Sequence, residues 1–234
     1  MRALVTGGTK GIGMAIAEAM VVAGGQVAIT GRDAARVREA ATALTKSAAP
    51  GGAVLGLVAD VRDRAAIDDA IDRAAAAFGG LDTLINNAGV GKFVSVEEMS
   101  DADWHQVIDT NLTGVFYATR AAIPHLKRAG GGWIINIASL AGRNYFANAG
   151  AYCASKAGLV ALSEATMLEL RNDNIRVSCV MPGSVATEFS HPAKHEDESW
   201  KLTADDIAEV VMDLLRHPSR SLPSKVEIRP SKTK

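Results

Sequence analysis

The sequence predicts one α/β domain, a parallel sheet of about seven strands with helices on both faces. Three observations predict this fold. Short apolar runs alternate with helical patterns, a glycine-rich turn joins the first run to the first helix, and a glycine or polar motif follows nearly every run. Hydrophobic residues make up 48% of the 234 residues, ample for a large core, and no repeat or long linker divides the chain. We therefore expect a single doubly wound, Rossmann-type domain over residues 1–234.

Charge and cysteine content narrow the class of protein. The net charge is −1, with 25 Lys and Arg interspersed among 26 Asp and Glu, so no basic stripe suggests nucleic acid or a membrane surface. The apolar run over residues 14–23 contains Glu18 and is too short for a membrane span, and no signal-peptide pattern precedes the glycines. Cys153 and Cys179 lie in apolar settings and are predicted to be unpaired core residues. These features predict a cytoplasmic protein that acts on small molecules.

The expected elements follow from the spacing of apolar residues and from the residues that typically start or end a helix or strand. Strands are predicted at residues 2–6, 26–30, 53–59, 83–85, 133–138, 176–181 and 225–228. Helices are predicted at residues 14–22, 34–45, 64–78, 103–128, 150–170 and 203–216. Pro124 is expected to kink or divide the fourth helix, and Asn111 to cap a local break or hold a water. The polar segment up to residue 201 predicts a substrate lid at about residues 184–201.

The glycine turn T-G-G-T-K-G-I-G follows the first strand and opens the first helix. Gly7, Gly11 and Gly13 allow the backbone to turn tightly and approach a phosphate, and the helix N-terminus offers free N–H groups to an anion. The spacing is G-x-x-x-G-x-G, so a turn without a ligand is an alternative interpretation. The predicted phosphate-binding residues are Gly7, Thr9, Lys10, Gly11, Ile12 and Gly13.

The end of the second strand bears on the choice between NAD and NADP. An acidic residue about 20 positions beyond the glycines would bind the adenosine ribose of NAD, but Gly31 stands there and Arg32 follows. Arg32 and Lys10 fit a ribose 2′-phosphate, and Asp33 is interpreted as the N-cap of the next helix. The sequence thus predicts that NADP(H) is preferred and that NAD(H) is possible. The alternative is that both cations are merely solvated.

Three residues near the fifth strand suggest acid–base chemistry. Tyr152 and Lys156 lie four apart, so a helix places them on one face, where the ammonium is expected to lower the pKa of the phenol. A phenol tuned in this way can exchange a proton in a transition state. Ser139 closes an apolar strand, and its hydroxyl can hydrogen-bond a carbonyl or alcohol oxygen. Ordinary packing of Tyr152 and capping by Ser139 are the alternatives.

These motifs together resemble the short-chain dehydrogenase/reductase family over residues 2 to about 216. The glycine turn, Asn86-Asn87-Ala88-Gly89, Asn111, Ser139, Tyr152-x-x-x-Lys156 and Pro182-Gly183 come in the family's order and spacing. The resemblance implies that Tyr152 is the general acid or base and that Ser139 polarises the substrate oxygen. It also implies that Lys156 binds the nicotinamide ribose and that Asn111 holds a water in a proton relay.

The resemblance implies further cofactor contacts. Asp60 and Val61 would meet the adenine, Asn87, Ala88 and Gly89 the nearby ribose, and Pro182, Gly183, Val185 and Thr187 the nicotinamide carboxamide and the diphosphate. It also implies a homodimer or homotetramer formed through the helices at residues 103–128 and 150–170.

Similarity extends to 3-oxoacyl-[acyl-carrier-protein] reductases, but two features argue against that substrate. Trp133 and Asp173 stand where those enzymes typically carry arginines for the carrier protein. The chain also ends in V-E-I-R-P instead of a strand with Asp-Gly-Gly.

We therefore predict an NADP(H)-dependent oxidoreductase that moves a hydride between the nicotinamide and a ketone or secondary alcohol. An NAD-linked alcohol dehydrogenase and a nucleotide-sensing protein without turnover are the alternatives. Arg143 and Asn144 are candidates to recognise a polar or acidic group. Apolar pocket candidates, for which ordinary packing is equally plausible, are Phe93, Tyr145, Phe146, Phe189 and Trp200.

A metal site at His191, His195, Glu196 and Asp197 is disfavoured, because Pro192 breaks a helical presentation of the two histidines. No metal is predicted.

Overall fold

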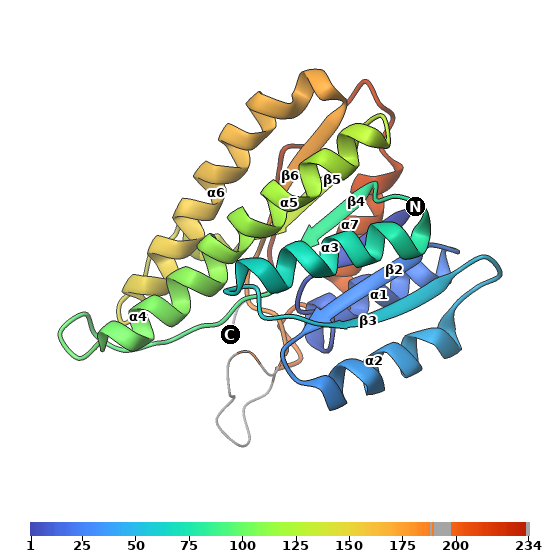
Figure 1. The fold of residues 1–234 in the computed structure, drawn as a ribbon. Coiled ribbons are helices and arrows are strands. Elements are labelled where there is room, and N and C mark those ends of the chain that lie inside the picture. The colour runs from blue at the N-terminus through green and yellow to red at the C-terminus, as the bar shows by residue number, and fades with distance from the viewer. Residues whose placement is uncertain (188, 190–197, 233–234) are drawn as a thin grey trace.

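The computed structural model describes residues 1–187, 189 and 198–232, and these form an α/β domain (Figure 1). Its seven strands are all parallel and lie in the order β3-β2-β1-β4-β5-β6-β7. The strands are β1 (Arg2–Val5), β2 (Gln26–Gly31), β3 (Ala53–Val58), β4 (Thr83–Asn86), β5 (Gly132–Ile137), β6 (Ile175–Pro182) and β7 (Lys225–Ile228). The predicted single domain and seven-stranded sheet are confirmed.

Helices cover both faces of the sheet (Figure 1). The helices are α1 (Gly11–Val22), α2 (Ala34–Ser47), α3 (Arg64–Phe78), α4 (Asp101–Ile108), α5 (Gly114–Arg128), α6 (Gly150–Leu170) and α7 (Ala204–Arg216). Helices α1, α2 and α7 pack on one face, and α3, α5 and α6 pack on the other (Figure 1). Within the described ranges, no helix combines the length and apolar composition that a membrane span requires.

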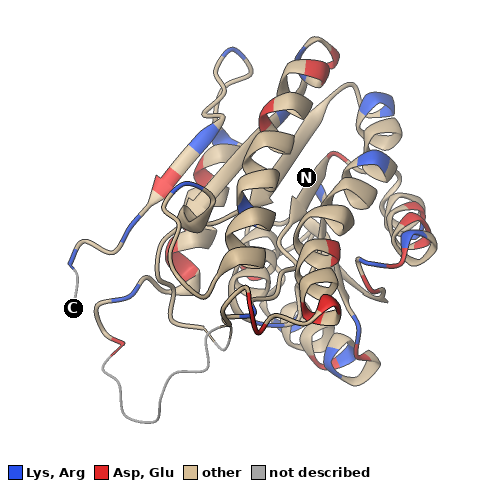
Figure 2. Ribbon diagram, turned by 90° about the vertical axis from the view of Figure 1, so that its left-hand side faces the viewer, with Lys and Arg blue, Asp and Glu red and all other residues tan. Residues whose placement is uncertain are grey.

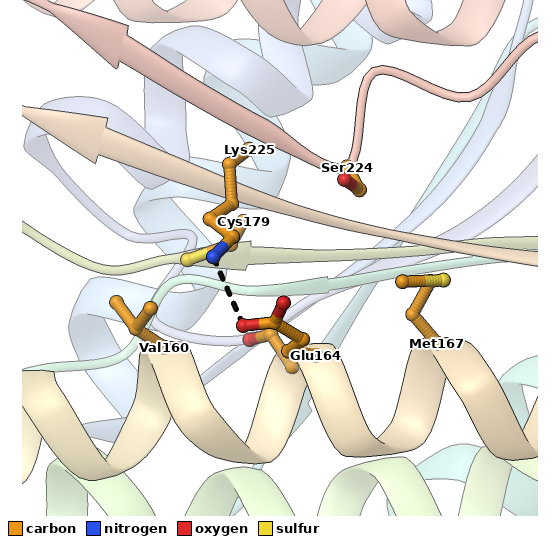
Figure 3. Close-up of a pocket in the computed structure, with 7 residues that line it drawn as sticks. Val160, Glu164, Met167, Cys179, Ser224 and Lys225 are labelled. Carbon is orange, nitrogen blue, oxygen red and sulfur yellow. Dashed lines mark hydrogen bonds and ion pairs between the residues drawn. The ribbon is translucent and has the colours of Figure 1, made fainter.

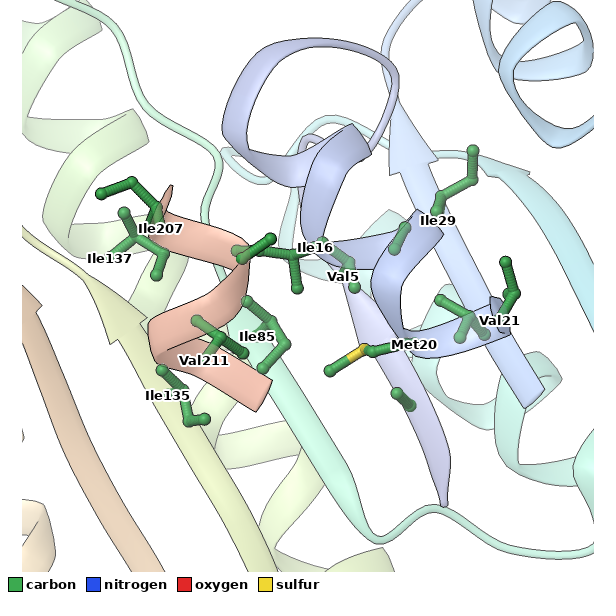
Figure 4. Close-up of a cluster of buried hydrophobic side chains, with 14 of the residues drawn as sticks. Val5, Ile16, Met20, Val21, Ile29, Ile85, Ile135, Ile137, Ile207 and Val211 are labelled. Atoms are coloured by element: carbon green, nitrogen blue, oxygen red, sulfur yellow. The ribbon is translucent and has the colours of Figure 1, made fainter. Parts of the chain in front are cut away.

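The core between the sheet and helices α1 and α7 anchors the glycine turn (Figure 4). Ile16 and Met20 of α1 are fully buried against Val5 of β1 and against Ile207 and Val211 of α7. Burying each such side chain contributes about 1.5–3 kcal/mol relative to leaving it exposed. Helix α1 is therefore held firmly, with its first turn at the carboxyl edge of the sheet.

The order of the strands sets the place of the site. The chain passes from β1 outward to β2 and β3, then crosses to β4 on the other side of β1. The sequence reverses its winding direction between β1 and β4, and ligands of such sheets bind at that switch point beyond the carboxyl ends of the strands. Every predicted motif that follows a strand lies at this edge.

One predicted element is wrong in detail. The helix expected at residues 103–128 is divided, but not at Pro124, which lies inside α5. The break is a π-helical segment, η1 (Asp109–Thr113), between α4 and α5, and Asn111 is at its centre. A π-segment inserts an extra residue per turn and is typical of functional sites. A local break therefore occurs at Asn111, but the Asn111 side chain does not cap it.

Smaller differences occur at the ends of elements. Helix α1 begins at Gly11 instead of residue 14, because the last glycines of the turn already form its first turn. The predicted lid starts and ends at a bridge between Val185 and Leu202, where Ala186 N donates to Leu202 O over 2.8 Å. Residues 188 and 190–197 lie outside the described residues, so the lid stays a prediction.

Candidate active site

The glycine turn and the Asn-Asn-Ala-Gly segment lock together at the switch point. Gly7 has a φ of +64°, and a Cβ there would lie 2.9 Å from Ala88 Cα. A Cβ on Gly13 would overlap Asn87 Nδ2 and the Gly7 carbonyl oxygen. The Thr6 hydroxyl accepts hydrogen bonds from Asn87 N (3.0 Å) and Ala88 N (3.1 Å). Only glycines allow this close approach of the two segments.

The start of α1 is suited to an anion. Lys10 is its N-cap residue, and in this described segment no side chain caps the first amides of the helix. Uncapped N–H groups and the positive end of the helix dipole favour a phosphate. Together with the glycine cradle, this geometry fits the diphosphate of a dinucleotide.

The end of β2 combines a tightly packed glycine with an exposed arginine. A Cβ on Gly31 would lie 2.7 Å from Thr9 Cγ2 and 3.0 Å from Val37 Cγ2, so a longer side chain does not fit without displacement. Arg32 is exposed directly beyond this glycine. Asp33 accepts hydrogen bonds from Ala35 N (2.8 Å) and Arg36 N (3.1 Å). Its predicted role as the N-cap of α2 is confirmed.

Asp60 and Val61 lie beyond the end of β3. The Asp60 carboxylate is held by the Arg62 guanidinium at 2.7 Å, and this hydrogen bond, with a smaller contribution from Arg32, lowers the pKa of Asp60. Val61 is buried and would lie 2.9 Å from a Cβ on Gly114 of α5. Asp60 and Arg32 therefore share one region of the carboxyl edge, as expected for the adenosine end of a cofactor.

Ser139, Tyr152 and Lys156 are brought together. Ser139 follows β5 and caps the 3-10 turn η2 (Leu140–Gly142) by accepting a hydrogen bond from Ala141 N over 3.1 Å. Tyr152 and Lys156 lie one turn apart on α6, which spans the predicted residues. Burial raises the pKa of the Tyr152 phenol, and a hydrogen bond with Ser139 acts in the opposite direction.

Lys156 behaves differently from the prediction. Its side chain is buried, and Nζ donates a hydrogen bond to the Ile137 carbonyl oxygen over 2.9 Å. Burial lowers the pKa of Lys156 to about 8. Nζ lies 5.9 Å from the centre of the Tyr152 ring. The expected lowering of the phenol's pKa by this ammonium is not seen in this structure, because burial of the phenol dominates and the ammonium binds Ile137.

Asn111 joins three segments of the site. It is fully buried, its Oδ1 accepts from Val90 N over 2.8 Å, and its Nδ2 donates to Val90 O (2.9 Å) and Ser155 Oγ (3.0 Å). A Cβ on Gly89 would lie 3.4 Å from Asn111 Oδ1 and 3.7 Å from Lys156 Nζ. Asn111 thus fixes the loop after β4 against α6, beside Lys156.

Sequence reasoning missed several supporting groups. Thr6, Ser155 and the Ile137 carbonyl each hold a predicted residue in place. Asn86 and Asn136 also pair across β4 and β5 at 2.8 Å. The position of Thr6 directly before the first glycine was a usable signal. The other contacts join distant segments and leave no local pattern.

Aromatic rings lie beside Tyr152. Phe93 lies 5.6 Å and Phe189 5.8 Å from the Tyr152 ring centre, and Phe146 stacks on Phe93 at 6.1 Å. Tyr145 is 70% exposed, and the structure places Trp200 elsewhere, in a groove of about 590 Å³ with residues of α7 and the C-terminal segment. Three of the five predicted pocket aromatics therefore converge on Tyr152.

The two polar candidates differ in what they contact. Arg143 Nη1 pairs with Glu227 Oε1 of β7 at 2.8 Å, and the same carboxylate binds Arg229 Nη2 at 2.9 Å. Asn144 is exposed, and its backbone N donates to the Leu140 carbonyl oxygen over 2.8 Å.

A small cavity lies between α6, β6 and the start of β7 (Figure 3). Its volume is about 10 Å³, room for about one water, and the Lys225–Glu164 ion pair at 2.9 Å borders it. Cys179 lines it, is buried and unpaired, and burial raises the pKa of its thiol. Cys153 is likewise buried and unpaired, as predicted.

The metal alternative falls on His191, His195, Glu196 and Asp197, which lie outside the described residues. Elsewhere, in residues 1–187, 189 and 198–232, no group of three or more His, Cys, Asp and Glu side chains is arranged to hold a metal ion.

The charged side chains of the described residues are mixed over the surface, with Lys and Arg next to Asp and Glu on most helices (Figure 2). This distribution gives no support to a nucleic-acid partner.

Comparison with known proteins identifies the family. The profile of the short chain dehydrogenase family matches residues 1–198. The D-threitol dehydrogenase of Mycolicibacterium smegmatis is 39% identical over 82% of this chain and 72% of its own. The (2S)-[(R)-hydroxy(phenyl)methyl]succinyl-CoA dehydrogenase subunit BbsD of Thauera aromatica is 34% identical over 91% of this chain and 88% of its own.

A solved metagenomic short-chain oxidoreductase in complex with NADP is 36% identical, with a TM-score of 0.85, over 99% of this chain and 97% of that chain. The chain belongs to the short-chain dehydrogenase/reductase family and is an oxidoreductase.

Proposed function

We propose that the protein is an NADP(H)-dependent oxidoreductase that interconverts a ketone and a secondary alcohol, with Tyr152 as the general acid or base. The observation that carries the proposal is the convergence of Ser139, Tyr152, Lys156 and Asn111 beside the glycine cradle. When bound, NADPH supplies the hydride.

The raised pKa of Tyr152 suits carbonyl reduction. A buried phenol whose pKa lies above its ordinary value keeps its proton at neutral pH and can donate it. The Ser139 and Tyr152 side chains are within hydrogen-bond reach of each other, so a carbonyl oxygen bound there would meet both hydroxyls. As that oxygen gains negative charge, the Tyr152 proton moves to it and the Ser139 hydrogen bond strengthens.

Lys156 and Asn111 complete the proposed proton path. We assign the Lys156 ammonium to the nicotinamide ribose, with the Ile137 carbonyl orienting it. Both N–H groups of the Asn111 amide are already used, so a water held by Asn111 would bind its main-chain carbonyl in the π-segment. In this role the water held by Asn111 gives a proton to Lys156 as the Lys156 ammonium passes one towards Tyr152.

The preference for NADP(H) rests on Lys10, Arg32 and the tight packing around Gly31. Two cations favour a phosphate, and an acidic side chain that would bind a free ribose has no room at position 31. The NADP complex of the metagenomic relative supports this assignment. The remaining proposed cofactor contacts are Thr9, Ile12, Asp60, Val61, Asn87, Ala88, Gly89, Pro182, Gly183, Val185 and Thr187.

The relatives leave the substrate open within the ketone and secondary alcohol class. One is named for a sugar alcohol, the other for an alcohol that carries a phenyl group and a coenzyme A thioester. Two local features disfavour a carrier-protein substrate. Trp133 is 3% exposed, and Asp173 pairs with Lys127 at 2.8 Å, so neither position offers a cation.

A screen of carbonyl compounds with NADPH tests the proposal. We expect the wild-type protein to oxidise NADPH with at least one ketone, and Tyr152→Phe to lower kcat by about 10²–10⁴-fold, the usual contribution of a general acid. NADPH affinity of the variant, from fluorescence titration, should stay within about threefold because the ring remains. Tight NADPH binding without turnover on any carbonyl would instead favour the nucleotide-sensing alternative.

We also propose a homo-oligomer formed through α5 and α6. Phe116 of α5 and Leu168 of α6 are 43% and 56% exposed, and Arg120 stacks over Phe116 at 4.8 Å. Exposed large apolar side chains on neighbouring helices favour a protein contact. Light scattering should show a dimer or tetramer that Phe116→Glu dissociates, and a monomeric wild type would refute the proposal.

A further inference from the structure

Three phenylalanines from three separate loops form an apolar cover beside the catalytic tyrosine, here named the aromatic roof. Phe93 follows β4, Phe146 follows β5 and Phe189 follows β6. Phe93 meets the Tyr152 ring edge-on at 5.6 Å, Phe189 lies 5.8 Å from it, and Phe146 stacks on Phe93. The roof therefore packs directly against the ring of Tyr152.

Gly91 lets the roof assemble. A Cβ on Gly91 would lie 2.9 Å from both Phe93 and Phe189, so only a residue without a side chain fits between the two rings. The two rings thus converge over one backbone position next to Tyr152. Any larger residue at position 91 would push at least one ring aside.

The roof is exposed although it is strongly apolar. Phe93, Phe146 and Phe189 are 45%, 52% and 40% exposed. Exposed apolar clusters of this kind mark sites that a ligand or partner covers. Because two of the three rings contact Tyr152, the substrate of this tyrosine is the group best placed to cover them.

The described cations of the three loops each have a carboxylate partner. In the described part of the three loops the cations are Lys92, Arg143 and Lys201. They pair with Asp103 (3.1 Å), Glu227 (2.8 Å) and Glu198 (2.5 Å) respectively. A carboxylate on the substrate would have to compete with a carboxylate of the protein for each of them.

We propose, on the basis of the hydride transfer proposed above, that the aromatic roof selects uncharged ketones that carry an aryl group on the carbonyl carbon. With the carbonyl oxygen at the Tyr152 and Ser139 hydroxyls, an attached ring falls against Phe93 and Phe189. Aromatic pairs prefer offset or edge-on contacts at 4.5–7 Å, and one such pair is worth about 2- to 12-fold in affinity beyond apolar contact alone. Phe93, Phe146 and Phe189 are then specificity-determining residues, and Gly91 is a positioning residue.

The test compares matched ketones and matched variants. Acetophenone and cyclohexyl methyl ketone share a carbon skeleton but differ in aromaticity, and 4-acetylbenzoate adds a carboxylate. The variants are Phe93→Leu, Phe146→Leu and Gly91→Ala. Tyr145→Leu is the control, because it changes an exposed aromatic residue in the same loop as Phe146 but outside the roof. Thermal unfolding of each variant checks that the fold is retained.

We expect wild-type kcat/KM with NADPH to be at least about fivefold higher for acetophenone than for cyclohexyl methyl ketone, and higher again than for 4-acetylbenzoate. Phe93→Leu and Phe146→Leu should bring the aryl-to-cyclohexyl ratio towards one, mainly by lowering the acetophenone value. Gly91→Ala should do the same by displacing the rings. Tyr145→Leu should keep the wild-type ratio.

Three outcomes would overturn the inference. These are a wild-type ratio near one, a ratio that the roof variants leave unchanged, and variants that alter the oligomeric state instead of the ratio, which would make the roof a protein interface. Binding separates this inference from the proposed function. If no ketone is reduced, yet saturation-transfer NMR of the wild-type NADP⁺ complex shows acetophenone binding that Phe93→Leu removes, hydride transfer fails and the aryl preference stands.

Discussion

The buried shell around Lys156 and the aromatic roof are built in opposite ways, although both contact Tyr152. In the shell, Asn111 and Lys156 are 0% and 5% exposed, and their polar atoms bond Val90, Ser155 and Ile137. The roof has no such network, and its rings are 40–52% exposed. The shell is fixed before any ligand binds, whereas the roof still exposes apolar surface that a ligand can cover.

This difference indicates that the buried shell handles the proton and the cofactor, and that the exposed roof selects the substrate. Proton handling and cofactor binding need fixed donors in a dry site, where preorganised groups act most strongly. Substrate choice needs surface that can vary without disturbing those donors. Changes that leave polar groups of the shell without partners should therefore lower stability, and changes in the aromatic roof should alter specificity alone.

The largest stability effect is expected inside the shell. Asn111→Leu keeps the approximate volume but leaves Val90 N–H and Val90 C=O without partners. Since a buried unsatisfied group costs about 1–3 kcal/mol, the free energy of unfolding should fall by about 3 kcal/mol or more. Urea denaturation measures this.

Asn144→Leu is the matched control, because Asn144 is exposed in the loop after β5. Its free energy of unfolding should stay within about 0.5 kcal/mol of the wild-type value. A loss below about 1 kcal/mol in Asn111→Leu would show that the shell is not interlocked.

The burial of Lys156 predicts a pH dependence of stability. Its pKa of about 8 lies below the ordinary 10.5, so between those values the unfolded chain holds a proton that the native protein has released. The native state therefore gains stability as pH rises from about 8 to 10.5, and the full penalty is present below pH 8. Lys156→Met removes the cost of burying the ammonium. The free energy of unfolding of the wild type, relative to that of the variant, should therefore rise by up to about 3 kcal/mol over this pH range.

Urea titrations of both proteins at pH 7 and at pH 10 measure the effect. Lys156 lowers the pKa of the neighbouring Cys179 thiol, so both proteins carry Cys179→Ser to remove that titration from the comparison. A difference between the two proteins that is independent of pH would show that Lys156 is not held in a desolvated site.

The smallest effect is expected at Arg143, in the exposed loop after β5. Arg143→Ala removes an exposed ion pair with Glu227, and such pairs contribute about 0–1 kcal/mol. Because Glu227 already neutralises Arg143, kcat/KM should change by less than about threefold for both uncharged and carboxylated ketones. A loss confined to the carboxylated ketone would show that Arg143 recognises an acidic group, against the preference inferred for the roof.

The sequence predicted the cofactor turn and the catalytic pair more fully than the aromatic roof. The glycine turn, the Asp33 cap and the Tyr152–Lys156 pair are local patterns, because a tight turn, a helix cap and a shared helix face each need particular residues within a few positions. The strand order and the two-sided layers follow from the alternation of apolar runs with helical patterns.

The remaining features depend on tertiary contacts. The sequence offered both Pro124 and Asn111 as reasons for a break in the long helix. The break occurs at Asn111, because its partners Val90 and Ser155 come from other segments. The ion pair between Arg143 and Glu227 joins residues 84 positions apart. Five aromatic residues were plausible pocket candidates, and only folding separates Trp200 from those that meet Tyr152.

A titration of NADPH and NADH against the wild type and Arg32→Ala tests most directly whether the site is built for a cofactor with a 2′-phosphate. Arg38→Ala, an exposed arginine on α2, is the control. A charge-assisted hydrogen bond is worth about 1.5–3 kcal/mol, so Arg32→Ala should weaken NADPH binding by about 10- to 100-fold and leave NADH binding and the Arg38→Ala protein unchanged. Equal affinity for both cofactors in the wild type, or tighter NADH binding, would contradict the account and favour an NAD-linked alcohol dehydrogenase.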